Sequence, residues 1–267
     1  MAALSETDAL DLLRHGRMEV EGRLADASNT TLRAILELDG VSARCVYKPV
    51  RGERPLWDFP DGTLAGREVS AYLVAAATGW DCVPPTVLRE HGPLGPGACQ
   101  LWIDEPEDAE PILGFVPPDE LPDGWHRIMR AHDEDGSPYL LAHADDRGLS
   151  RLAVFDAVVN NADRKGGHIL STVDGGVRGV DHGVCFNVEP KLRTILWGWI
   201  GDPLPSEAVE VLGKLRAELL GSLGDALAEH LTIAEVNEVA VRIDALLTSG
   251  RFPAPSEDWP AVPWPPV

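Results

Sequence analysis

The first hundred positions alternate between apolar and polar residues in short runs that turn signals separate. Strands are predicted over residues 18–24, 31–38, 43–49, 85–89 and 98–103. Alternation with a period of two buries one face of a strand, and Asp39-Gly40 is typical of a tight hairpin turn. Apolar residues at helical spacing, followed by Gly79, predict a helix over 67–78, and a short helix is predicted over 5–14.

The apolar spacing becomes helical after residue 148. Leu152, Phe155 and Val159 fit one helical face, and Thr232 with Glu235 forms a capping box before another helix. Further helices are predicted over 206–220 and 223–231, and two short strands over 168–172 and 178–180. The intervening stretch, 104–148, is rich in Asp, Glu and Pro. We interpret it as a hinge followed by an irregular, mostly solvated insert.

These elements predict an α+β fold in three parts. Residues 1–103 form an N-lobe with a five-stranded antiparallel sheet plus one helix between its strands, with the short helix 5–14 ahead of it. Residues 104–252 form a mainly helical C-lobe that includes the acidic insert. Residues 253–267 are a tail rich in Pro and Trp, which favours an extended segment packed on the surface.

Composition narrows the choice of partners. The 267 residues carry a net charge of -20, which disfavours nucleic acid and flat anionic membranes as partners. The four cysteines form no C-x-x-C pair, no signal peptide is recognisable, and no apolar run reaches the roughly 20 residues of a membrane helix. We therefore expect a soluble, cytoplasmic protein without stable membrane association.

Four charged side chains stand where phosphoryl-transfer chemistry needs them. Lys48 ends an apolar strand and Glu68 begins the next helix, so the two can pair and hold the lysine on nucleotide phosphates. Asp163 and Asp181 lie eighteen positions apart, each at the mouth of a short hairpin. One carboxylate can orient or deprotonate the acceptor while the other holds the metal that bridges the phosphates.

The order of these parts resembles the phosphatidylinositol 3- and 4-kinase-like branch of the protein-kinase fold. It resembles more closely a bacterial protein family with distant similarity to those kinases. The resemblance spans roughly Gly22 to Pro205 and is carried by residues 47–49, 66–72, 161–164 and 181–183. It implies a two-lobed protein-kinase-like fold, with a β-rich N-lobe and a mainly helical C-lobe, that uses ATP and Mg²⁺.

The resemblance also implies roles for single residues. Lys48, steadied by Glu68, would contact the α- and β-phosphates, and a loop within 22–30 would cover them. The adenine edge would be read by the backbone of a hinge made of Gln100, Leu101, Trp102 and Ile103. Asp163 would be the catalytic aspartate, Arg164 would orient its loop, and Asp181 would be the main Mg²⁺ ligand.

Two histidines depart from the kinase pattern. His168 stands where those kinases place a metal-binding Asn. Imidazole is a softer ligand than Mg²⁺ favours, so either one metal suffices, or Mn²⁺ is tolerated, or His168 has a structural or phosphate-facing role. His182, inside the D-x-G motif, is interpreted as a hydrogen-bonded structural residue.

Three functions fit these residues. The first is an ATP-dependent kinase whose acceptor is a small molecule or a protein. A lipid acceptor ranks last, because residues 184–205 contain Lys191 and Arg193 but no dense basic cluster. The second is a catalytically inactive, nucleotide-binding regulator. The third is an enzyme of the same fold that transfers AMP instead of phosphate.

Overall fold

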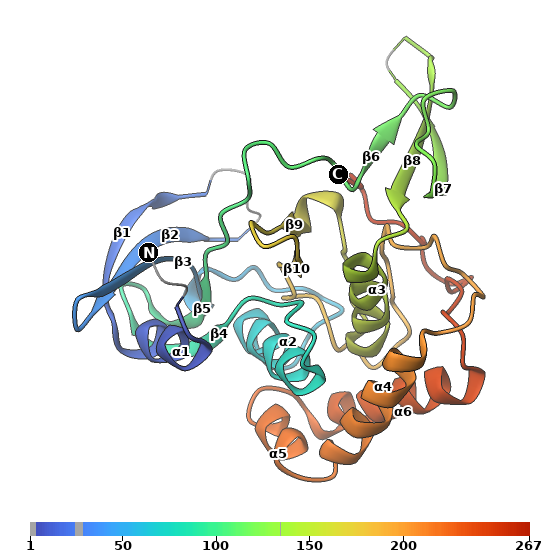
Figure 1. Cartoon of the computed structure of the whole chain (residues 1–267). Coiled ribbons are helices and arrows are strands. Elements are labelled where there is room, and N and C mark those ends of the chain that lie inside the picture. Colours follow the sequence, from blue (N-terminus) through green and yellow to red (C-terminus); the bar gives the residue numbers. More distant parts are fainter. Residues whose placement is uncertain (1–3, 25–28, 134) are drawn as a thin grey trace.

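The computed structural model describes residues 4–24, 29–133 and 135–267 (Figure 1). Its N-terminal part is a five-stranded antiparallel sheet in the order β1-β2-β3-β5-β4. The strands are β1 (Arg17–Arg23), β2 (Leu32–Leu38), β3 (Val41–Pro49), β4 (Thr86–Gly92) and β5 (Gly95–Leu101). The strands predicted over 18–24, 31–38 and 43–49 are therefore confirmed as neighbouring antiparallel strands. The loop expected to cover the phosphates lies partly outside the described residues.

Alternation along β3 separates its side chains onto two faces. Cys45 and Tyr47 are fully buried, and Cys45 belongs to the cluster that α1 (Glu6–His15) covers. Val46 and Lys48 point to the opposite face, because successive side chains of a strand alternate. This face lines a cavity between the sheet and the rest of the chain.

Helix α2 (Leu64–Thr78) is fixed at both ends and along its buried side. The Thr63 hydroxyl caps its first turn, and Gly79 ends it in a left-handed conformation at a φ of 68°. The buried Arg67 guanidinium donates to Glu235 on α6 at 2.5 Å and to the Cys185 carbonyl at 2.8 Å. These bonds fix the rotation of α2 that directs the neighbouring Glu68 toward the sheet.

The acidic stretch 104–148 is more ordered than the sequence indicates. It contains a three-stranded antiparallel sheet in the order β6-β8-β7 that projects from the body (Figure 1). The strands are β6 (Leu113–Val116), β7 (Trp125–His132) and β8 (Pro138–Ala144). The expectation of a mostly irregular insert was wrong for these residues. A register shift between Arg127 and Met129 interrupts the period-two pattern of β7 and hides it from sequence reading.

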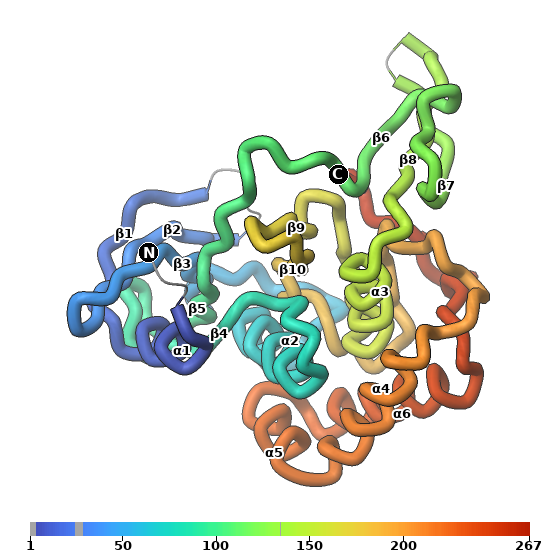
Figure 2. The backbone as a smooth tube through the Cα atoms, in the orientation of Figure 1, coloured from blue at the N-terminus to red at the C-terminus, as the bar shows by residue number. Residues whose placement is uncertain are grey.

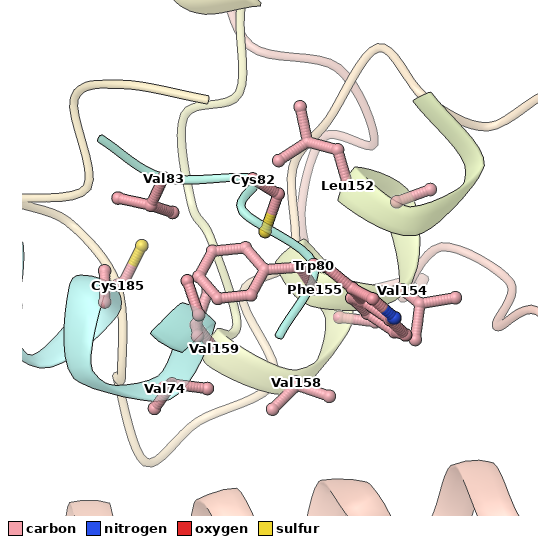
Figure 3. Close-up of a cluster of buried hydrophobic side chains, with 14 of the residues drawn as sticks. Val74, Trp80, Cys82, Val83, Leu152, Val154, Phe155, Val158, Val159 and Cys185 are labelled. Atoms are coloured by element: carbon pink, nitrogen blue, oxygen red, sulfur yellow. The ribbon is translucent and has the colours of Figure 1, made fainter. Parts of the chain in front are cut away.

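The regular elements of the C-terminal part are helices and one short hairpin, joined by irregular segments. Its elements are α3 (Arg147–Val159), β9 (Ile169–Ser171), β10 (Val177–Gly179), α4 (Ser206–Glu218), α5 (Ser222–Ala228) and α6 (Ile233–Ser249). Buried side chains of α3 pack against Trp80, Cys82 and Val83 from the connection between α2 and β4 (Figure 3). The capping box of Thr232 and Glu235 at α6 is confirmed. No helix in the described ranges is both long and apolar enough to cross a bilayer.

Candidate active site

Arg164 is the buried centre of the loop that follows α3. Its guanidinium and the Asp156 carboxylate form two parallel bonds, Nε to Oδ2 at 2.9 Å and Nη2 to Oδ1 at 3.0 Å. Both side chains are fully buried. Two bonds in parallel fix orientation as well as distance. The helix therefore anchors the loop directly behind Asp163.

Other N–H groups of Arg164 reach the D-H-G motif, Asp181-His182-Gly183, and the residues near it. Nη1 donates to the carbonyls of His168 at 3.1 Å and Val180 at 2.8 Å. Nη2 lies 2.7 Å from Nε2 of the buried His182. Arginine only donates, so His182 accepts with Nε2 and carries its proton on Nδ1. Burial, together with the Arg164 charge, holds the pKa of His182 well below its ordinary value. The structural interpretation of His182 fits these contacts.

Lys48 joins the sheet, α2 and the D-H-G motif. Its ammonium pairs with the buried Glu68 carboxylate and lies 2.8 Å from Oδ1 of Asp181. Burial lowers the pKa of Lys48, but Asp181 and Glu68 outweigh that effect and raise it above its usual value. Lys48 in turn holds the pKa of Asp181 well below its usual range. The second Glu68 oxygen accepts from the His182 N–H at 3.0 Å.

His168 bridges the two aspartates. Its Nδ1 lies 3.0 Å from the backbone carbonyl of Asp163, and its Nε2 lies 3.3 Å from Oδ2 of Asp181. A carbonyl can only accept, so Nδ1 carries the proton of that bond. Burial lowers the pKa of His168, which favours the neutral ring. In this tautomer the Nε2 lone pair faces the Asp181 carboxylate.

Two adjoining cavities meet at these side chains. The first, of about 340 Å³, is lined by all four predicted hinge residues, by apolar side chains such as Val46 and Leu170, and by Lys48, His168 and Asp181. The second, of about 220 Å³, is lined by Asp163 and Lys165 and shares Lys48, His168 and Asp181 with the first. Every predicted site residue except the buried Arg164 lines at least one of the two cavities, and Glu68 lines the second.

The hinge residues differ in what they can still bind. The Leu101 N–H donates to the Pro85 carbonyl at 2.9 Å, and the Trp102 N–H donates to the Arg44 carbonyl at 3.0 Å. Gln100 is buried, and its side-chain amide donates to the Thr86 hydroxyl. Within the described part of the chain, the Ile103 N–H makes no hydrogen bond. Ile103 is therefore the hinge residue best placed to donate to a ligand.

A metal ion at this site would need donor atoms from a bound ligand in addition to those of the protein. Within residues 4–24, 29–133 and 135–267, no three His, Cys, Asp or Glu side chains are grouped as a metal site. The facing Asp181 carboxylate and His168 Nε2 supply two donor atoms. Mg²⁺ and Mn²⁺ sites of nucleotide enzymes commonly add phosphate oxygens and water to one or two protein ligands. The residues present fit such a shared site.

Sequence reasoning missed Lys165 and Asp156. The Lys165 ammonium lies 3.1 Å from Oδ2 of Asp163, inside the second cavity. A signal was available, because the chain has only four lysines against nineteen arginines. Lys48 and Lys165 are two of those four. Asp156 gave no such signal, because the sequence does not show which side chain pairs with a carboxylate on an apolar helix face.

No family model matches the chain. Protein Rv2133c of Mycobacterium tuberculosis (strain ATCC 25618 / H37Rv) is 46% identical over 273 residues, covering 99% of this chain and 98% of that protein. The chain belongs to the Rv2133c family.

Solved structures identify the fold of this Rv2133c-family chain. A golgi casein kinase aligns with a TM-score of 0.56 at 13% identity, over 91% of this chain and 74% of the other. Hydra Fam20, determined with sugar, aligns with a TM-score of 0.55 at 14% identity, over 91% and 87%. At such identities the likeness shows the fold alone. The predicted kinase-like fold, with a sheet-rich N-terminal part and a helical C-terminal part, is confirmed at that level.

Proposed function

We propose that this protein is an ATP-dependent phosphotransferase that works with a divalent metal. The observation that carries the proposal is the meeting of Lys48, Glu68 and Asp181 at the junction of the two cavities. An ammonium held by two carboxylates beside an apolar cavity is suited to a nucleotide, whose base fills the cavity and whose phosphates replace a carboxylate on the lysine. The kinase-like fold supports the same reading.

The nucleotide would lie across the first cavity. Its base would contact the hinge residues Gln100 to Ile103, and the Ile103 N–H would donate to the adenine edge. Lys48 would hold the α- and β-phosphates. Asp181 and Nε2 of His168 would hold Mg²⁺ or Mn²⁺, which neutralises charge on the phosphates when bound. The imidazole nitrogen favours Mn²⁺ more than an oxygen ligand would.

Transfer would take place in the second cavity. Asp163 accepts the proton of the acceptor hydroxyl, whose oxygen bonds to the γ-phosphorus. The bond between that phosphorus and its bridging oxygen breaks, and ADP leaves with the electron pair. Lys165 would stabilise charge on the transferred group, and Arg164 would keep the loop in place. We propose that the acceptor is a small molecule or a protein. We also propose that the protein is related more specifically to the phosphatidylinositol 3- and 4-kinases.

Two aspartate variants test the assignment of roles. Asp181→Ala should abolish metal-dependent binding of a non-hydrolysable ATP analogue in isothermal titration. Asp163→Ala should bind the analogue normally and lose ADP production from ATP. Asp119→Ala serves as the control, because Asp119 is exposed and lines neither cavity. An unchanged rate of ADP production in Asp163→Ala would refute the catalytic assignment.

The same experiment separates the alternative functions. A protein that binds the analogue but makes no ADP with any acceptor, or on itself, is a nucleotide-binding regulator. Incubation with ATP labelled at the α-phosphate, followed by mass spectrometry, reveals an AMP adduct if the enzyme transfers AMP. Phosphotransfer predicts an adduct of one phosphate and no AMP adduct.

A further inference from the structure

The C-terminal segment 259–267, termed the strap here, runs beside the site. The Ala261 carbonyl accepts from the Thr194 N–H at 3.1 Å and from the Trp197 indole at 2.8 Å. The Pro266 carbonyl accepts from the Gly166 N–H at 2.7 Å. Figure 2 shows the C-terminus beside β6 and next to the loop that leads to β9. The strap therefore bonds directly to the loop 163–168 that carries Asp163.

The strap also supports this loop through a second layer. Thr194 forms an isolated parallel bridge with Arg164. The Arg164 N–H donates to the Arg193 carbonyl at 3.0 Å, and the Ile195 N–H donates to the Arg164 carbonyl at 3.2 Å. Strap, segment 193–195 and catalytic loop are thus hydrogen-bonded in series. Displacement of the outer layer would loosen the inner one.

Gly166 shows how closely the strap approaches. A Cβ atom added there would lie 2.7 Å from Cγ1 of Val267 and 2.8 Å from Cδ1 of Leu113 on β6. Both distances are well inside van der Waals contact. The loop is enclosed between the strap and β6, and the absence of a side chain at Gly166 permits that approach.

Lys191 fastens the other end of the strap. Its side chain is 5% exposed, and its ammonium lies 2.9 Å from Oδ2 of Asp58. The same ammonium lies 4.2 Å from the ring centroid of Trp259 and 5.0 Å from that of Trp57. A cation this close to an aromatic face is attracted to it. One lysine therefore links the strap, the segment after the D-H-G motif and the loop ahead of α2.

We propose that residues 259–267 are a positioning strap that holds the catalytic loop, and with it Asp163, in the geometry needed for transfer. The proposal rests on the proposed function and deepens it. None of the strap's hydrogen bonds described above reaches Lys48, Asp181 or the hinge, which would contact the nucleotide. The loop also carries His168, one of the two proposed metal ligands, so changes in the strap should lower kcat by a larger factor than they raise the KM for ATP.

Four variants test the strap. Deletion of residues 265–267 removes the acceptor of the Gly166 N–H, and Trp259→Ala removes the ring over Lys191. Trp259→Phe retains an aromatic face as the conservative rescue. Trp264→Ala is the matched control, because this tryptophan is 78% exposed. Thermal unfolding verifies that each variant is folded, and hydrogen exchange with mass spectrometry reports on residues 163–168.

The expected results separate positioning from general stability. Loss of one backbone hydrogen bond with its packing should raise amide exchange in 163–168 and lower kcat for ADP production by roughly five- to tenfold. The KM for ATP should rise by a smaller factor than kcat falls, Trp259→Phe should recover most of the rate, and Trp264→Ala should match the natural protein. Unchanged amide exchange of residues 163–168 in the deletion variant would overturn the proposal, and so would equal losses of kcat in Trp259→Ala and Trp264→Ala. If the natural protein binds nucleotide but makes no ADP, the proposed transfer fails, and the exchange data still decide whether the strap orders the loop.

Discussion

Replacement of Asp156 by asparagine tests whether the buried pair with Arg164 holds the site together. The amide can keep at most two of the three donors, because Oδ1 accepts from Arg164 and Asn161 while Oδ2 accepts from Arg164 alone. An NH₂ group in either position faces an N–H donor. The substitution also leaves the Arg164 charge in the core, with no carboxylate beside it. Breaking a buried pair in this way costs about 3–5 kcal/mol.

The assay is thermal unfolding, with Glu207→Gln as a matched control. With an unfolding entropy of about 2.1 cal/mol/K for each of the 267 residues, the loss corresponds to a fall in Tm of roughly 5–9 °C. Glu207 also pairs with two arginines, Arg147 and Arg151, but at the surface. Its replacement should lower Tm by less than about 2 °C.

The two variants should also differ in nucleotide binding. Arg164 holds the carbonyls of His168, a proposed metal ligand, and of Val180, the residue before Asp181, so Asp156→Asn should weaken binding of an ATP analogue as well. Glu207→Gln should leave that affinity unchanged. Equal Tm shifts in the two variants would refute the claim that the buried pair organises the site.

Two further predictions concern histidines. Burial lowers the pKa of His143 to about 4 and that of His182 well below its usual value. The unfolded chain takes up protons near pH 6.5 while the folded one does not, so stability should fall as the pH drops from 7.5 to 5.5, by about 1.4 kcal/mol for each of the two. His143→Gln should reduce this fall in stability by about 1.4 kcal/mol in thermal unfolding, and replacement of the exposed His132 by Gln should leave the fall unchanged. Equal slopes in all three proteins would contradict the reasoning. For metal binding, His168→Asn should weaken Mn²⁺ relative to Mg²⁺ in the presence of an ATP analogue, because it exchanges a nitrogen for an oxygen ligand. In pulsed electron paramagnetic resonance the natural protein should show a ¹⁴N coupling to bound Mn²⁺ that is replaced by a ¹⁵N coupling on labelling with ¹⁵N-histidine, and the absence of any histidine nitrogen coupling would exclude His168 as a ligand.

Local elements of this chain follow from neighbouring residues. Asp39-Gly40 forms the β2–β3 turn, and both residues have positive φ. The capping box at Thr232 and the stop of α2 at Gly79 are also as predicted. Each of these features depends on side chains within four positions of one another. The sheet β6-β8-β7 escaped prediction, because its strands are held by pairing partners rather than by a regular pattern of their own.

The sequence by itself determined the order of strands and helices outside β6, β7 and β8, and the types of side chain available to the site. Tertiary structure alone decided that Lys48 meets Asp181, which lies 133 positions further along the chain. It also decided that Arg164 joins Asp156 to His182, that His168 presents Nε2 to Asp181, and that Pro266 contacts the loop 163–168. The physical reason is the distance along the chain over which each kind of interaction acts. Turns and caps are set by short-range sterics and hydrogen bonds, whereas the direction of a charged side chain is set by the partners that folding brings to it.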